Sequence, residues 1–238
     1  MIFQAATPAS LVAFVAIVVA VAGAIVWAIG YAFKSLKAAG LAALALAVWL
    51  AALSLLVQSG RMASLPLGGL PLFFGPIVLF WTALGLSAVG RLVAATVPLA
   101  LLVGFQAFRL PLELVLHAWA TQGTIPETMT WTGQNWDILS GGLALLAAPF
   151  ATRFPRVVRM TNIVGLALLL NVMRVAVLSS PVPFGWGVQP PLLLVFHLPY
   201  AFIGPVCVGG ALFGHIVLTR ALWKKAPSHQ LSAVRSQP

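Results

Sequence analysis

The sequence predicts an all-α, polytopic bundle of transmembrane helices with about seven spans. Of the 238 residues, 61% are hydrophobic and only 7% are charged, whereas about a quarter of the residues in an average soluble domain are charged. The apolar residues gather in runs of roughly 20, the length that a helix needs to cross a bilayer. Because backbone groups in lipid must bond internally, helices are the expected form of these runs.

The apolar runs form a single transmembrane domain that covers residues 1–225. The expected spans are residues 10–33, 38–57, 71–90, 92–119, 137–152, 160–179 and 191–218. The first run is too long for a signal-peptide core, so we expect it to be retained. The fifth run is short, and we expect it either to cross with little tilt or to begin within the preceding loop. Residues 226–238 are polar and predict a short, disordered cytoplasmic tail.

The basic residues predict the orientation of the spans. Among 13 lysines and arginines, only Arg61 falls at one set of span ends, and Arg109 and Arg174 lie within spans. The others fall at the opposite set of ends: Lys34, Lys37, Arg91, Arg153, Arg156, Arg159, Arg220, Lys224, Lys225 and Arg235. Cytoplasmic ends carry the excess of Lys and Arg. An odd number of spans then places the N-terminus outside and the C-terminus in the cytoplasm of a bacterium, with the inner membrane as the expected location.

Composition also limits the partners and cofactors. The net charge of +10 does not indicate a nucleic-acid partner, because the basic residues sit at the ends of apolar runs. Cys207 is the only cysteine, which excludes an intramolecular disulfide and a cysteine-rich metal site. The sequence contains no nucleotide-binding loop, dinucleotide fingerprint or HExxH pair. We therefore expect no cofactor and no metal, and the lipid bilayer is the expected partner.

Ionisable groups inside apolar spans are costly, so each is a candidate functional group. The span at 92–119 carries Arg109, Glu113 and His117, which are spaced four apart and therefore share one helix face. If the helix starts at Arg91, the rise of about 1.5 Å per residue places Arg109 about two-thirds of the way across. The sequence therefore predicts a polar stripe in the outer half of this span.

Polar residues of two further spans are expected at the same depth. Asn171 and Arg174 share a face of the sixth span, and His197 falls in the outer half of the seventh. The sequence therefore predicts a polar pocket that opens to the outer face and is covered by the loop 120–136. His215, the one clear candidate in the inner half, is expected to be structural.

These groups have expected roles in the pocket. The expected catalytic groups are Arg174, His197, Glu113, His117 and Asp137. The expected substrate-binding groups are Arg109, Asn135, Asn171, Ser140 and Trp136. An arginine can stabilise an anion, and a histidine can act as a general acid or base. Structural alternatives are an Arg109–Glu113 ion pair, an interhelical contact of Asn171 and a helix N-cap at Asp137.

Three of these motifs resemble the exosortase/archaeosortase family of membrane-embedded cysteine transpeptidases. Ser140-Gly141, Asn171-x-x-Arg174 and His197 follow one another as in that family, over about residues 130–215. The resemblance implies a site on the outer side of the membrane. The family's cysteine precedes the Ser-Gly pair, but here that position is Leu139. Since a thiol mechanism needs sulfur near the base, transpeptidase activity is not implied.

The sequence leaves three functions open. The first is an exosortase-like membrane enzyme without the cysteine nucleophile, acting on a peptide or lipid-linked substrate. The second is a non-catalytic partner in an envelope assembly, with the polar groups as internal glue. The third is a transporter in which Arg109, Glu113 and His117 form a relay. The expected confinement of the polar groups to the outer half counts against the transporter. The stretch from Phe108 to Gly141 also resembles bacterial multi-pass membrane proteins, which implies no activity.

Overall fold

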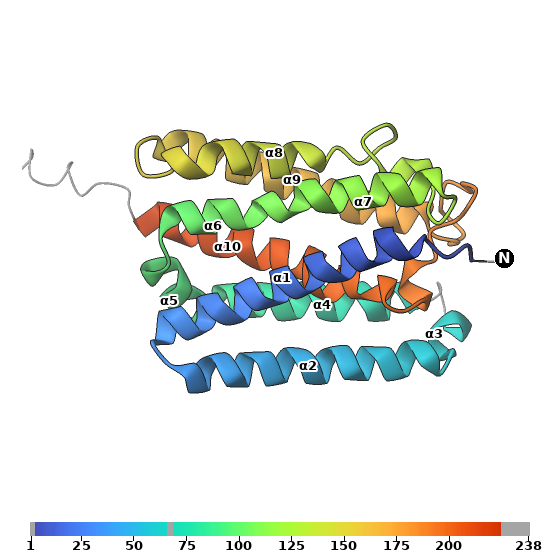
Figure 1. Cartoon of the computed structure of the whole chain (residues 1–238), viewed down its shortest axis with the longest axis horizontal. Helices are drawn as coiled ribbons and strands as arrows, with labels where there is room; N and C mark the ends of the chain where they lie inside the picture. The colour runs from blue at the N-terminus through green and yellow to red at the C-terminus, as the bar shows by residue number, and fades with distance from the viewer. Residues whose placement is uncertain (1–2, 66–68, 225–238) are drawn as a thin grey trace, which may run out of the picture.

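The computed structural model describes residues 3–65 and 69–224, and within these ranges every regular element is helical. This confirms the predicted all-α class. The long helices lie side by side along the long axis of the molecule (Figure 1). The predicted tail, residues 226–238, lies outside the described residues.

The helices follow the apolar runs of the sequence. In chain order they are α1 (Pro8–Phe33), α2 (Leu36–Gln58), α3 (Arg61–Ser64), α4 (Leu70–Leu86), α5 (Ala88–Thr96), α6 (Leu99–Phe105), α7 (Arg109–Thr121), α8 (Ile138–Ala147), α9 (Pro155–Ser179) and α10 (Gly209–Lys224). The 3₁₀ turn Gln106–Phe108 joins α6 to α7, so these form one helical stretch, Leu99–Thr121. A 3₁₀ turn, Tyr200–Ile203, and a π-helical turn, Gly204–Val208, lead into α10.

Several helices are long and apolar enough to cross a membrane. Within the described ranges, five single helical stretches meet this condition, and the bent pair of α4 and α5 would add a sixth. The five are α1, α2, α9, Leu99–Thr121 and Tyr200–Trp223. The chain is therefore a multi-pass membrane protein in its helical architecture. The predicted fifth span is represented by Ile138–Phe150, which is shorter than these.

The connections between helices separate into two ends of the bundle (Figure 1). The α1–α2 turn, helix α5, the α8–α9 turn and the last residues of α10 lie at one end. The N-terminus, α3, the loop after α7 and the segment after α9 lie at the other. We call the first the basic end, because its helix ends and turns carry Lys34, Lys37, Arg91, Arg153, Arg156, Arg159 and Arg220.

The predicted boundary between the third and fourth spans is wrong. Arg91 lies inside α5, which is bent by 59° relative to the helix Phe73–Leu86. Ser87 causes this break, since its hydroxyl accepts a hydrogen bond from Val89 N at 3.1 Å and caps a new helix. Pro98, which has no backbone N–H, separates α5 from the next helix, so the next long apolar helical stretch begins at Leu99.

The seventh predicted span begins with irregular backbone rather than helix. It was expected from residue 191, but the helical stretch starts at Tyr200, so His197 precedes it. The fifth, predicted from residue 137, begins with helix α8 at Ile138, and irregular backbone precedes it. Residues Thr130 and Asn135, just before it, are fully buried in protein, which is where irregular backbone is tolerated at membrane depth.

Glycine brings α8 close to the neighbouring helix. A Cβ atom on Gly141 would lie 2.4 Å from Leu110 N, a distance that no side chain tolerates. Ser140 and Ala144 on the same helix are also buried. This close approach of α8 and α7 places the start of α8 beside Arg109.

Candidate functional site

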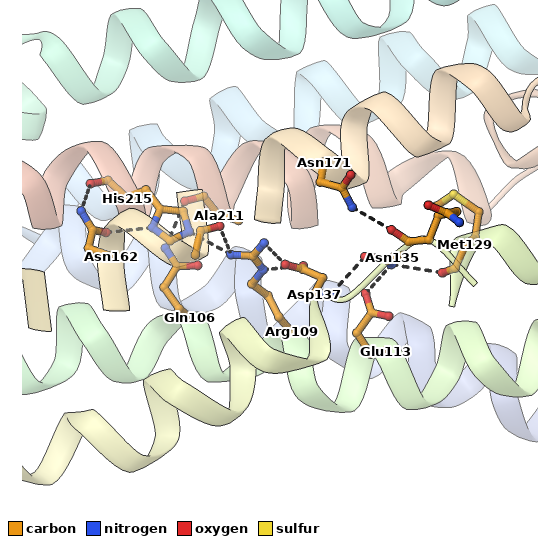
Figure 2. Close-up of polar contacts among 12 residues, drawn as sticks. Gln106, Arg109, Glu113, Met129, Asn135, Asp137, Asn162, Asn171, Ala211 and His215 are labelled. Atoms are coloured by element: carbon orange, nitrogen blue, oxygen red, sulfur yellow. Dashed lines mark hydrogen bonds and ion pairs between the residues drawn. The ribbon is translucent and has the colours of Figure 1, made fainter. Parts of the chain in front are cut away.

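The most highly connected polar group of the interior is the Arg109 guanidinium, at the start of α7. Arg109 is 1% exposed. Its Nε donates to Asp137 Oδ2 at 2.5 Å, and its Nη2 donates to Asp137 Oδ1 in a bidentate ion pair (Figure 2). Asp137 is the N-cap residue of α8, as the structural alternative predicted, but its side chain makes no cap bond there because it pairs with Arg109. The Arg109–Glu113 ion-pair alternative is also not observed, because Asp137 takes this position.

The same guanidinium reaches α9 and α10. Arg109 Nη1 donates to the Gly165 carbonyl at 3.0 Å and to His215 Nε2 at 2.8 Å (Figure 2). A guanidinium has only donors, so His215 Nε2 accepts and the ring carries its proton on Nδ1. That proton is donated to Asn162 Oδ1 at 2.8 Å. Asn162 Nδ2 then donates to Thr219 Oγ1 at 2.7 Å.

On the other side of Arg109, the network continues to Glu113. Asn135 Nδ2 donates to Glu113 Oε1 at 2.8 Å and to Met129 O at 3.1 Å (Figure 2). Asp137 N donates to Asn135 Oδ1 at 3.1 Å, which ties the two acids together through one amide. Glu113 is 1% exposed, and its Oε2 has no hydrogen-bond partner among the described residues.

A small cavity of about 60 Å³ adjoins both acids. Arg109, Glu113 and Asp137 line it, and nearly all of its other walls are apolar, including Leu169 and Cys207. By volume alone the cavity has room for a few water molecules, since one water needs about 10–15 Å³ by the same measure. Glu113 thus lines a small space in the protein interior, while its unpartnered Oε2 is itself buried.

Arg174 and Asn171 lie outside this buried network. Arg174 is exposed, and its Nη2 and Nε donate to Asn171 Oδ1 at 2.8 and 3.2 Å. Its guanidinium also lies over the Trp186 ring, 5.6 Å from the centroid. Asn171 Nδ2 donates to Gln134 O at 2.7 Å, so this pair contacts the segment that leads to the buried acids but not the acids themselves.

The two outer histidines also remain outside the network. His197 stacks on Phe3 with ring centroids 3.8 Å apart, and partial burial lowers its pKa below the usual value of a histidine. His117 stacks on Trp131 at 4.3 Å. Trp136 is exposed. His117, Arg174 and His197 therefore do not join Arg109 in the predicted outer pocket; the fourth, sixth and seventh spans meet instead at Arg109, Gly165 and His215.

Three buried polar residues were not predicted from the sequence to belong to the site. Asn162 and His215 were not expected in the site, and Gln106, which donates to Ala211 O at 3.0 Å, was given no role. Ser140 was expected in the site, and it is buried one turn into α8. With the correct helix boundaries, the sequence would have placed His215 at the same depth as Arg109. Counted from Leu99, Pro155 and Lys224 at the basic end, Arg109, Gly165 and His215 all lie about 14–15 Å along their helices.

The network offers no metal-binding cluster in the described part of the chain. No three His, Cys, Asp or Glu side chains there are grouped so that they could hold a metal ion. What the arrangement can do is hold and exchange a proton at Glu113, beside a fixed positive charge. Comparisons of the chain with protein-family models, curated proteins and solved structures found no match.

Proposed function

We propose that this protein is a proton-linked membrane carrier in which Glu113 binds and releases the proton. The observation that carries the proposal is the unpartnered carboxylate oxygen of Glu113, a residue that is buried beside the Arg109–Asp137 ion pair and lines a cavity. Buried ionisable groups inside spans are typical of proton relays in pumps and transporters.

A count of charges supports one exchangeable proton in the network. The bidentate pair balances Arg109 against Asp137, and His215 is neutral by its hydrogen bonds. Ionised Glu113 would add an uncompensated charge in an apolar interior, which costs several kcal/mol. Glu113 therefore holds a proton at rest, and it exchanges that proton through the cavity that it lines.

Arg109 has a separate task in this proposal. A guanidinium does not release its proton in proteins, so it blocks direct hopping between Glu113 and His215. When Glu113 loses its proton, the new carboxylate competes with Asp137 and His215 for the guanidinium. Release of His215 Nε2 would then leave that nitrogen, which faces Arg109, free to accept a proton. The partners of Arg109 thus decide whether His215 can bind a second proton.

The continuation toward the basic end favours transport over the other functions. The network reaches from Glu113 through Arg109 and His215 to Asn162 and Thr219. Without such a continuation, a carrier would have no route beyond its outer half. The positions of Arg109 and His215, near the middle of their helical crossings, supply it.

The finer topology is part of the proposal. We infer seven crossings, with α8 and the buried segment before it as the fifth, an outer N-terminus and a cytoplasmic C-terminus. The gathering of basic residues at one end of the bundle supports this orientation, and it outweighs the single Arg61 of α3, which lies at the opposite end (Figure 1). The bacterial inner membrane is the corresponding location. Sided thiol labelling would test this orientation in two variants, Lys37→Cys and Arg61→Cys, each made in a Cys207→Ala background.

The proton site is tested by charge movement in proteoliposomes on a solid-supported membrane. A pH jump should give a transient current in the wild type, because Glu113 gains or loses a proton. Glu113→Gln should abolish most of this current. Glu127→Gln is the matched control, since Glu127 is an exposed acid of the neighbouring loop, and it should retain the current. An unchanged current in folded Glu113→Gln would contradict the proposal.

A second function is favoured by the exposed Arg174 guanidinium, which Asn171 orients. In this reading the protein is an enzyme that acts at its outer face on an anionic peptide or lipid-linked substrate. Arg174→Ala and His197→Ala should then abolish complementation of a deletion strain while membrane insertion stays intact. Full complementation by both variants would exclude it. If Glu113→Gln also complemented fully, and the protein were isolated in a stable complex, an assembly role would replace both proposals.

A further inference from the structure

A deep apolar groove lies on the surface of the bundle between α1, α2 and α4, three helices that run side by side in Figure 1. Its volume is about 610 Å³, within the range of about 300–1,000 Å³ that is typical of small-molecule sites. Ile29, Phe33, Leu41, Trp49 and Phe80 are among its walls. The groove therefore suits a long hydrocarbon chain rather than a polar ligand.

One end of the groove carries an unusual concentration of positive charge. Phe33 and Ala38 line the groove, and Lys34 and Lys37, which adjoin them in the chain, are exposed. Ser35 caps α2 by accepting a hydrogen bond from Ala38 N at 3.2 Å, so Lys37 stands in the first turn of that helix. A helix N-terminus already bears partial positive charge and favours anions.

No acid of the protein compensates these charges. The three acidic residues of the whole sequence all lie between residues 113 and 137. In the described part of the chain, the only salt bridge is the one between Arg109 and Asp137. Arg91, exposed on the neighbouring helix α5, adds a further positive charge at this end. The anion that complements Lys34 and Lys37 must therefore come from outside the chain.

We propose that this groove binds an anionic phospholipid, with an acyl chain against α1, α2 and α4 and the phosphate between Lys34 and Lys37. An acyl chain matches the apolar walls, and a lipid phosphate matches the lysines and the α2 N-terminus. The site is separate from Glu113 and its network, and it does not rest on the proposed carrier function.

Native mass spectrometry of the detergent-purified protein tests the headgroup. Phosphatidylglycerol should bind more tightly than phosphatidylcholine with the same acyl chains. The double variant Lys34→Gln/Lys37→Gln should bind phosphatidylglycerol about 30-fold more weakly, since each surface cation contributes about 1 kcal/mol to anionic-lipid binding. Arg156→Gln/Arg159→Gln is the matched control, because it removes two exposed charges from the same end without touching the groove. The control should bind as the wild type does.

A second variant tests the groove itself. Ala45 is an exposed residue of α2 that lines the groove, so Ala45→Trp fills the space without altering any charge or any buried contact. Loss of room for two or more methylenes should weaken binding at least about tenfold. Excess inorganic phosphate should not displace the lipid, since it offers no acyl chain. Equal binding of phosphatidylcholine, unchanged binding in either variant, or displacement by phosphate would each overturn the proposal.

Discussion

Arg109 donates to His215 across the bundle at 2.8 Å, and this contact fixes which nitrogen of the imidazole carries the proton. His215 must then donate from Nδ1, and Asn162 Oδ1 accepts at 2.8 Å. A single arginine thus determines the hydrogen-bond direction over three helices.

Replacing Asn162 by leucine removes the acceptor of the His215 Nδ1–H group. Since Asn162 is 4% exposed, the unpaired donor should cost about 1–3 kcal/mol of unfolding free energy. Denaturation in mixed detergent micelles measures this change. Asn171→Leu is the control, because its partner Arg174 is exposed and water can replace the contact; its cost should stay below about 1 kcal/mol. Equal losses in the two variants would argue against a buried network.

The Arg109–Asp137 pair should behave as one unit. Arg109→Gln or Asp137→Asn leaves a buried charge without its partner and should destabilise the protein by about 3–5 kcal/mol. The double variant should lose clearly less than the sum of the single variants, because both charges are absent. Unfolding of all three variants in the same detergent completes the cycle. Simple additivity would mean that the two side chains do not depend on one another.

Gly165 holds the place where His215 packs against α9. A Cβ atom there would lie 2.6 Å from His215 Cε1, in a site that is already filled. Gly165→Ala should therefore destabilise the protein by about 1–3 kcal/mol and weaken the Arg109–His215 contact. Gly142→Ala is the matched helical control, since nothing lies within 4 Å of its added Cβ; it should be neutral or stabilising by up to about 1 kcal/mol. Melting temperatures in the same detergent test this: Gly165→Ala should melt lower than Gly142→Ala, and the reverse order would contradict the prediction.

Cys207 reports on access to the cavity beside Glu113. It is the only cysteine of the sequence, it is buried, and it lines this cavity. Its reaction with N-ethylmaleimide should be about a hundredfold slower than that of Ser59→Cys, in a Cys207→Ala background, because it requires a local opening that costs about 3 kcal/mol. Ser59 is exposed at the end of α2. Comparable rates, followed by mass spectrometry, would show that the cavity is open.

Helix depth explains which parts of the site could be predicted from the sequence. Apolar runs and the positions of basic residues indicated the helices, and the spacing of Arg109 and Glu113 indicated a shared buried face. The predicted depth of Arg109 was wrong, because the sequence stays apolar across the breaks at Ser87 and Val97–Pro98. With the fourth crossing counted from Leu99 instead of Arg91, Arg109 moves from the outer half to the middle, beside His215.

By itself, the sequence determined the class of this protein. Burying so many apolar residues requires lipid, and a backbone in lipid requires helices. Only the tertiary structure decided the partners of the polar residues. The pair of Arg109 and Asp137 depends on the close approach at Gly141, and Arg109 meets His215 because α6, which leads into α7, packs on α10. Periodicity places a side chain on a face, but packing between helices determines what that face meets.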